Sequence, residues 1–142
     1  MSASATHRAF WNRVVEKRLD AAVELLDPKG TFWSRPIGTV PMEAFIYIMM
    51  AVQRACPMTF DIRSDIEDGT RSVLEMQGHG LFSPSGEPYE NAYVFIADVK
   101  NGLISHLREY NDSAYSNAVF GRNLPPEVQQ TFGQMVAKAQ SS

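Results

Sequence analysis

Residues 78–112 read GHGLFSPSGEPYENAYVFIADVKNGLISHLREYND, with two turn signals between long runs rich in apolar residues. Ser85-Gly86 and Asn101-Gly102 tolerate the positive φ angles of tight turns, so each marks a reversal between antiparallel strands. Upstream, Asp68-Gly69 gives a third signal of the same kind. The pattern predicts four consecutive strands, with no parallel pair among the strands of the sheet, over residues 58–66, 71–82, 89–99 and 103–112.

Helical patterns lie on either side of these strands. Apolar residues recur at helical spacing over 6–26, where Thr6 is a candidate N-cap, and again over 42–55. A short strand is expected between them at 31–35, and a C-terminal helix at 125–139, where proline can occupy the first turn. Helices followed by a strand meander predict an α+β protein with an antiparallel sheet.

The composition is that of one globular domain covering residues 1–142, with 44% apolar and 20% charged residues. A formal charge of −3 and scattered basic residues argue against a nucleic-acid or membrane partner. The N-terminus lacks the features of a signal peptide, and the apolar run 44–52 is too short to span a bilayer. A single cysteine, Cys56, fits a reducing compartment, so we expect a cytoplasmic protein.

No motif for a phosphate-binding loop, a dinucleotide fold or a nucleophile elbow is present in the sequence. The three histidines show no zinc-ligand spacing, so neither a metal nor a cofactor is expected. What remains is acid–base chemistry by isolated side chains.

Glu109 is the first candidate for that chemistry. Strand alternation places Leu103, Leu107 and Glu109 on one face of 103–112. A carboxylate at the end of an apolar face has its pKa raised by desolvation, which suits general acid–base catalysis. The residues alone leave a second interpretation open, in which Glu109 is solvated or paired with an arginine.

Three further residues each allow two interpretations. Trp33 could be a platform for a ligand or part of the core, and Arg35 could hold a developing negative charge or lie on the surface. His79 lies between two glycines, which lets another group approach closely, although a hydrogen-bonded structural histidine fits equally well.

The segment G-x-G, then G-x-x-Y-E-N, then N-G-L-I with R-E-Y resembles the SnoaL-like branch of the nuclear transport factor 2-like superfamily. That superfamily includes ketosteroid isomerase and small phenazine-biosynthesis proteins, and the resemblance to the latter is especially close. It covers residues 6–120 and leaves 125–139 as an extension. It implies a cone-shaped fold in which a curved sheet packs on helices around an apolar pocket, usually in a homodimer without a cofactor. By the register of R-E-Y, Glu109 matches the pocket carboxylate of the phenazine proteins.

No catalytic set of the relatives is complete in this chain. Arg35 stands where ketosteroid isomerase has its aspartate base, and the oxyanion-hole aspartic acid of that enzyme falls near Tyr93 or Val94. The histidine and serine of the phenazine proteins fall near Ile48 and Val52. Steroid isomerisation by the known mechanism is therefore not expected.

Two functions follow from these observations. In the first, the protein is a cofactor-free isomerase, cyclase or lyase acting on an apolar polyketide-, terpenoid- or steroid-like metabolite, with Glu109 moving a proton and Arg35 stabilising negative charge. In the second, it binds or carries such a molecule without catalysis. The expected binding residues are Trp33, His79, Ile48, Val52, Tyr93 and Leu107, and we expect a homodimer formed through the outer face of the sheet.

Overall fold

The computed structural model describes residues 1–141, and the four strands of the meander form as expected. They are β3 (Met58–Asp68), β4 (Arg71–Leu81), β5 (Pro88–Lys100) and β6 (Leu103–Asn111), and each pairs antiparallel with the next. Every bound lies within two residues of the sequence prediction. Positive φ angles at the turn glycines, such as 59° at Gly69, show why the turn signals were informative.

The sheet has two further strands, and one of its pairings is parallel. β1 (Leu26–Ser34) lies beside β6 in parallel, and β2 (Gly38–Pro41) pairs antiparallel with β1 at the edge. The strand order is β2-β1-β6-β5-β4-β3. The expectation of a wholly antiparallel sheet is therefore wrong for one pair, because pairing between strands so distant in the chain depends on tertiary packing that no turn signal encodes.

The N-terminal helix is broken into two, which corrects the single helix predicted over 6–26. α1 (Ala3–Val15) and α2 (Leu19–Val23) are separated by a bend in which Lys17 has a φ of 62°. Ser2, not Thr6, caps α1 by accepting a hydrogen bond from the backbone of the first turn, and Thr6 is buried. β1 begins at Leu26, earlier than the predicted start at residue 31.

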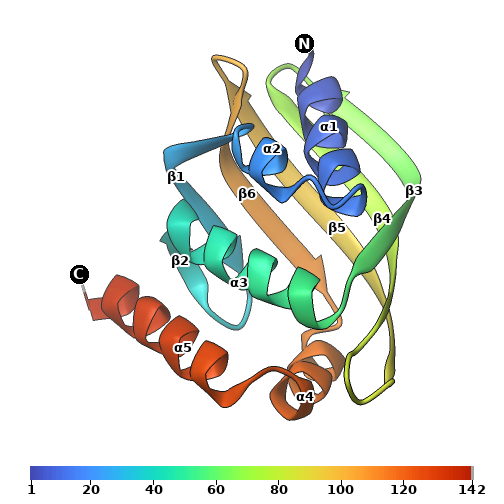
Figure 1. The fold of residues 1–142 in the computed structure, drawn as a ribbon. Helices are drawn as coiled ribbons and strands as arrows, with labels where there is room; N and C mark the ends of the chain where they lie inside the picture. The colour runs from blue at the N-terminus through green and yellow to red at the C-terminus, as the bar shows by residue number, and fades with distance from the viewer. Residues whose placement is uncertain (142) are drawn as a thin grey trace.

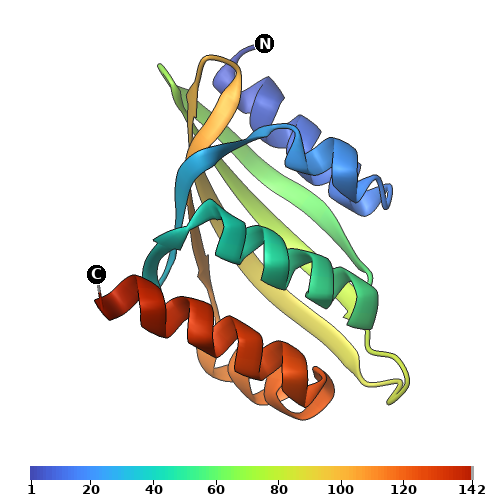
Figure 2. The ribbon, with the colours of Figure 1, turned by 60° about the vertical axis from the view of Figure 1, so that its left-hand side comes forward.

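The helices lie on one face of the curved sheet, as Figures 1 and 2 show. α3 (Met42–Ala55) has the predicted bounds, and it crosses the sheet beside α1. The chain ends in α4 (Ser113–Asn123) and α5 (Pro126–Ser141). α5 confirms the C-terminal prediction and packs on α3 and β2, whereas α4 was not predicted.

The hydrophobic core lies between the inner face of the sheet and the helices. Trp11 of α1 packs against Phe95 of β5 and Phe60 of β3, with ring centroids 4.3 and 4.9 Å apart. Phe45 of α3 stacks on Phe32 of β1 at 4.5 Å. These aromatic contacts hold both helices against the concave side of the sheet, which is left unclosed between β2 and β3.

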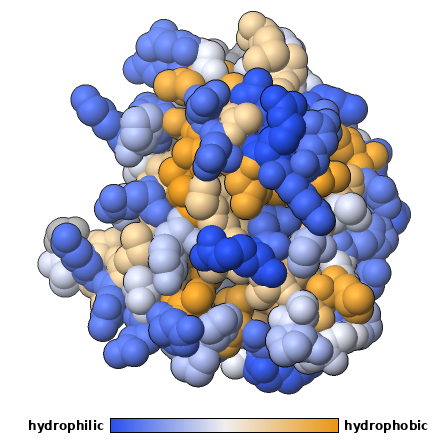
Figure 3. Space-filling view, viewed as in Figure 1, coloured by the Kyte–Doolittle hydropathy of each residue, from blue (hydrophilic) through white to orange (hydrophobic). Residues whose placement is uncertain are grey.

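The opposite, outer face of the sheet carries no helix in residues 1–141 (Figure 2). Half-buried Trp33 packs there with Tyr110 at 5.0 Å, and the Arg108 guanidinium lies 4.9 Å from the Trp33 ring centre. The helical face, seen in Figure 3, mixes polar side chains with hydrophobic patches between the helices. Within the described chain, no helix is both long and apolar enough to cross a membrane.

Candidate functional site

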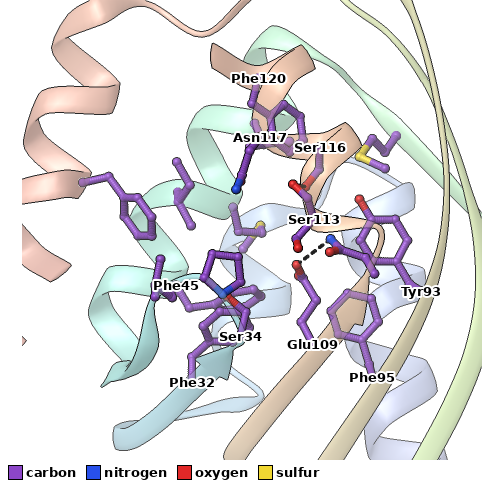
Figure 4. Close-up of a pocket in the computed structure, with 18 of the residues that line it drawn as sticks. Phe32, Ser34, Phe45, Tyr93, Phe95, Glu109, Ser113, Ser116, Asn117 and Phe120 are labelled. Carbon is purple, nitrogen blue, oxygen red and sulfur yellow. Dashed lines mark hydrogen bonds between the residues drawn. The ribbon is translucent and has the colours of Figure 1, made fainter.

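A pocket of about 170 Å³ opens between α3, α4 and the inner face of the sheet (Figure 4). Its walls are mainly apolar and aromatic, and its polar side chains come mostly from the end of β6 and from α4. The lining residues are Trp11, Phe32, Ser34, Pro36, Ile37, Phe45, Ile48, Met49, Val52, Gln53, Met58, Phe60, Tyr93, Phe95, Glu109, Asn111, Ser113, Ser116, Asn117, Phe120 and Phe132.

Glu109 is the one acidic side chain among the residues that line this pocket. It projects from the inner face of β6, level with Ser34 on β1 and Phe95 on β5. Within residues 1–141 the carboxylate forms no ion pair, and its hydrogen bond comes from neutral Asn111, whose Nδ2 donates to Oε2 at 3.0 Å. Burial raises the pKa of Glu109 to about 7.

A β-bulge decides which side chains share the face of Glu109. The pairing of β6 with β5 shifts between the pairs Val99–Ile104 and Asp98–His106. The extra residue reverses the alternation, so buried Ile104, rather than Leu103, joins Leu107 and Glu109 on the inner face. Alternation therefore placed Glu109 correctly only because the bulge lies before Leu107.

A chain of buried hydroxyl and amide groups starts beside Glu109. The Tyr93 hydroxyl lies 2.6 Å from that of Tyr89, which accepts a hydrogen bond of 2.9 Å from Asn91 Nδ2. Desolvation, reinforced by the charge of Glu109, raises the pKa of Tyr93 far above its ordinary value. Tyr93 therefore stays protonated at neutral pH and can serve as a hydrogen-bond donor.

The same amide fixes the start of α4. Asn91 Nδ2 donates to the Asp112 carbonyl at 3.2 Å, and Asn91 Oδ1 accepts from the Asp112 backbone at 3.3 Å. The Asp112 side chain caps α4 by accepting from the Tyr115 N–H at 3.1 Å. As a result, α4 turns back over the pocket and presents Ser113, Asn117 and Phe120 to it at helical spacing.

Arg35 does not lie in the pocket, which corrects the expected pairing of the two charged groups. β1 ends at Ser34, so Arg35 is exposed in the turn that follows. In β1 it is Phe32 and Ser34 that line the pocket. Arg35 is not among the lining residues, so no guanidinium faces Glu109.

Of the six expected binding residues, Ile48, Val52 and Tyr93 line the pocket, whereas Trp33, His79 and Leu107 do not. Trp33 lies on the outer face, and Leu107 is fully buried in the core without lining the pocket. Strand parity puts Leu107 on the face of Glu109 without giving the pocket's position along that face, and it groups Trp33 with Thr31 and Arg35 without saying which face of the strand is the inner one.

His79 lies on the outer face, held between two carboxylates. Its Nε2 is 2.8 Å from Asp61 Oδ2, and its Nδ1 is 2.6 Å from Glu90 Oε2. The hydrogen bond with Asp61 is the main cause of its raised pKa. The neighbouring glycines do allow close approach, but by core atoms: a Cβ on Gly80 would lie 2.5 Å from Cys56 Sγ.

Several residues that line the site had no local signal in the sequence. Trp11 of α1, Asn111 of β6 and the α4 residues belong to it through tertiary packing, and only the Asp112 capping signal before α4 was available to predict any of them. In the part of the chain that the structure describes, no group of three or more His, Cys, Asp or Glu side chains could hold a metal ion.

The curved, unclosed sheet packed on helices is the fold of the nuclear transport factor 2-like proteins. A solved protein of that description from Burkholderia pseudomallei, of unknown function, superposes with a TM-score of 0.70 at 18% identity, over 83% of this chain and 97% of the other. Residues 7–107 match the family model described as the SnoaL-like domain, so the chain belongs to the SnoaL-like family.

Two other solved structures with this fold carry functional descriptions. IdmH from Streptomyces antibioticus, a candidate polyketide cyclase, has a TM-score of 0.72 at 17% identity over 85% of this chain and 99% of its own. An epoxide hydrolase of the LEH-like type from M. tuberculosis has a TM-score of 0.69 at 16% identity over 79% and 84%. No curated protein matches the chain. At these identities the likeness establishes the fold.

Proposed function

We propose that the protein is a cofactor-free enzyme in which Glu109 moves a proton on a small, largely apolar molecule. The observation that carries this proposal is a carboxylate in an apolar pocket with a pKa raised to about 7 and no cation beside it. A group with a pKa near the working pH both accepts and donates protons effectively.

In the proposed step, ionised Glu109 removes a proton from a carbon next to a carbonyl group. The C–H electron pair moves into the new carbon–carbon double bond, and the carbonyl oxygen becomes an enolate. Tyr93, the other ionisable side chain that lines the pocket, is protonated and offers a hydrogen bond to that oxygen. Where the substrate has a carbon–carbon double bond next to the carbon that lost the proton, the enolate is a dienolate. Glu109 then returns the proton to the far carbon of that double bond, which shifts the double bond into conjugation with the carbonyl group and isomerises the molecule.

The size of the pocket favours a small substrate. A cavity of about 150 Å³ binds one benzene molecule, and this pocket measures about 170 Å³. A one-ring compound therefore fits the site as it stands, whereas a multi-ring polyketide or a steroid would require α4 and α5 to move. Relatives described as a candidate polyketide cyclase and an epoxide hydrolase support small-molecule chemistry of this general kind.

One observation favours binding without catalysis as the second candidate. Arg35 lies outside the pocket, so Glu109 has no charged partner to stabilise an enolate. If the Tyr93 hydroxyl is too deeply engaged with Tyr89 to reach the ligand, the pocket binds or carries its ligand unchanged.

Proton exchange separates the two candidates. The protein is incubated with acetophenone in D₂O near neutral pD, and exchange of the methyl protons is followed by NMR. Glu109→Gln should slow the catalysed exchange by roughly a hundredfold to ten-thousandfold. Glu75→Gln is the matched control, since Glu75 faces away from the pocket and accepts from Ser64 at 3.3 Å. Saturable binding with no exchange above the buffer rate would favour the carrier.

A further inference from the structure

α4 lies outside the part of the chain that matches the family, yet it supplies a wall of the pocket. The family match ends at residue 107, and α4 begins at Ser113. Ser113, Ser116, Asn117 and Phe120 line the pocket from this helix. Like Glu109, these side chains lie beyond the end of the family match, so the match alone does not place them in the site.

The position of α4 is firmly fixed. Phe120 stacks on Tyr89 with ring centroids 5.1 Å apart, and Tyr115 stacks on Tyr89 from the same helix at 5.4 Å. At its C-terminal end, Arg122 Nε donates to the Glu87 carboxylate at 3.0 Å. With its start held by Asn91 of β5 and its end by Glu87 in the turn before β5, α4 is anchored at both ends. Side chains on its pocket face are therefore preorganised.

Asn117 is, with Ser113, one of two pocket-lining α4 residues whose side chains have no hydrogen-bond partner among residues 1–141, and it is an exposed residue. Its amide has no partner among residues 1–141, whereas Asn123 on the same helix donates to Glu87 and Asn111 donates to Glu109. Ser116 is also engaged, donating to the Ser113 carbonyl at 3.3 Å. Figure 4 shows the Asn117 side chain extending from α4 towards the space that Glu109 enters from the sheet.

We propose that Asn117 is the specificity-determining residue of the pocket and donates a hydrogen bond to an acceptor oxygen of the ligand. The ligand class is then a one-ring, largely apolar molecule carrying a carbonyl oxygen. The inference rests on the proposed function in so far as both place the ligand in this pocket. It differs in that it concerns binding, which is measurable without any turnover.

The test compares two probes of nearly equal shape. Acetophenone has a carbonyl oxygen where α-methylstyrene has a CH₂ group, so only acetophenone can accept a hydrogen bond. Dissociation constants for both are measured by NMR titration with the full-length protein. We expect the wild-type protein to prefer acetophenone by roughly threefold to tenfold, the range of one net hydrogen bond.

Asn117→Leu should abolish this preference. Asn117→Asp keeps the size but removes the N–H donor, so it should abolish the preference too. Gln134→Leu is the matched control, because it removes an exposed amide from α5 that does not line the pocket. That variant should retain the wild-type preference.

A wild-type protein without the preference, or an Asn117→Leu variant that retains it, would overturn the proposal. Its failure can be told apart from failure of the proposed chemistry. If acetophenone is preferred through Asn117 but its protons do not exchange, the Asn117 contact stands and the acid–base function falls. If exchange depends on Glu109 but Asn117→Leu leaves the preference intact, the acid–base function stands and the Asn117 contact is refuted.

Discussion

Asn111 donates a hydrogen bond of 3.0 Å to Glu109 from two residues further along the same face of β6. A hydrogen bond to the ionised carboxylate favours that form, so it opposes the desolvation that raises the pKa. Burial raises the pKa of Glu109 to about 7, and on this argument the pKa would be higher still without the hydrogen bond from Asn111.

Removing the donor should move the pH dependence of proton exchange. Asn111→Leu keeps the approximate size and deletes the hydrogen bond, so the pKa of Glu109 should rise and the ascending limb of the rate profile should shift to higher pH. The measurement is acetophenone exchange in D₂O at a series of pD values. An unchanged profile would show that Asn111 does not act on the carboxylate.

Glu109 should also make the folded state less stable as pH rises. Its folded pKa of about 7 exceeds the ordinary value of 4.5, so the folded protein binds more protons than the unfolded chain between these values. Stability is then greatest below pH 4.5 on this account and falls as pH rises through 7. The full effect is about 3 kcal/mol in the free energy of unfolding.

Glu109→Gln has no such titration. In urea denaturation at pH 8 the variant should be more stable than the wild-type protein by up to about 3 kcal/mol. The difference should shrink towards pH 5. Equal stability of the two proteins at pH 8 would mean that Glu109 is solvated or paired in solution.

Local sequence signals predicted the meander and the side of β6 on which Glu109 lies. Gly69 and Asn101-Gly102 specify reversals through backbone conformation alone, so the strands between them could be bounded without tertiary information. α3 and α5 were likewise predictable from the spacing of their apolar residues.

The rest of the site depends on contacts between distant residues. Ser34 lies level with Glu109 through parallel pairing of β1 with β6, and Asn117 reaches the pocket because Asn91 orients α4. Neither relationship has a local signal. Arg35 was a candidate because of its positive charge, but it lies one position beyond the end of β1 and is exposed to solvent.

The outer face of the sheet should form a homodimer interface. Val94 and Ile96 of β5 lie half-buried there beside Trp33 and Tyr110, and Tyr110 is 42% exposed. Uncovered apolar faces of this kind are typical of interaction sites. Sedimentation at micromolar concentration should give a dimer, and Val94→Glu should give a monomer. Ala118→Glu is the control, because Ala118 is an exposed residue of α4, and this variant should remain a dimer. A monomeric wild-type protein would contradict this proposal.

The glycines around His79 should be required for packing. In Gly80→Ala the new Cβ would lie 2.5 Å from Cys56 Sγ and 3.1 Å from Met58 Cγ, both in the core. Overpacking of this kind costs about 1–3 kcal/mol of stability. Gly121→Ala is the control, since nothing lies within 4 Å of its added Cβ and alanine favours the helix. Thermal unfolding should show opposite shifts in Tm, and equal shifts would exclude the packing role.

Removal of α5 should open the pocket without unfolding the domain. No α5 residue is fully buried, and the helix is held by partly buried Phe132, Met135, Val136 and Ala139, with Gln140 Nε2 donating to the Ile37 carbonyl at 2.5 Å. Phe132 lines the pocket, so a chain ending at Leu124 loses part of its wall and exposes apolar surface.

We expect the shortened chain to keep the circular dichroism of the sheet, to bind the dye ANS more strongly and to bind acetophenone more weakly than the full-length protein. A chain ending at Gln140 is the matched control, because it keeps Phe132 and nearly all of α5. It should behave as the full-length protein does. If the chain ending at Leu124 binds acetophenone as tightly as the full-length protein, then Phe132 and α5 contribute nothing to ligand affinity, and the ligand must be held by the sheet, α3 and α4 alone.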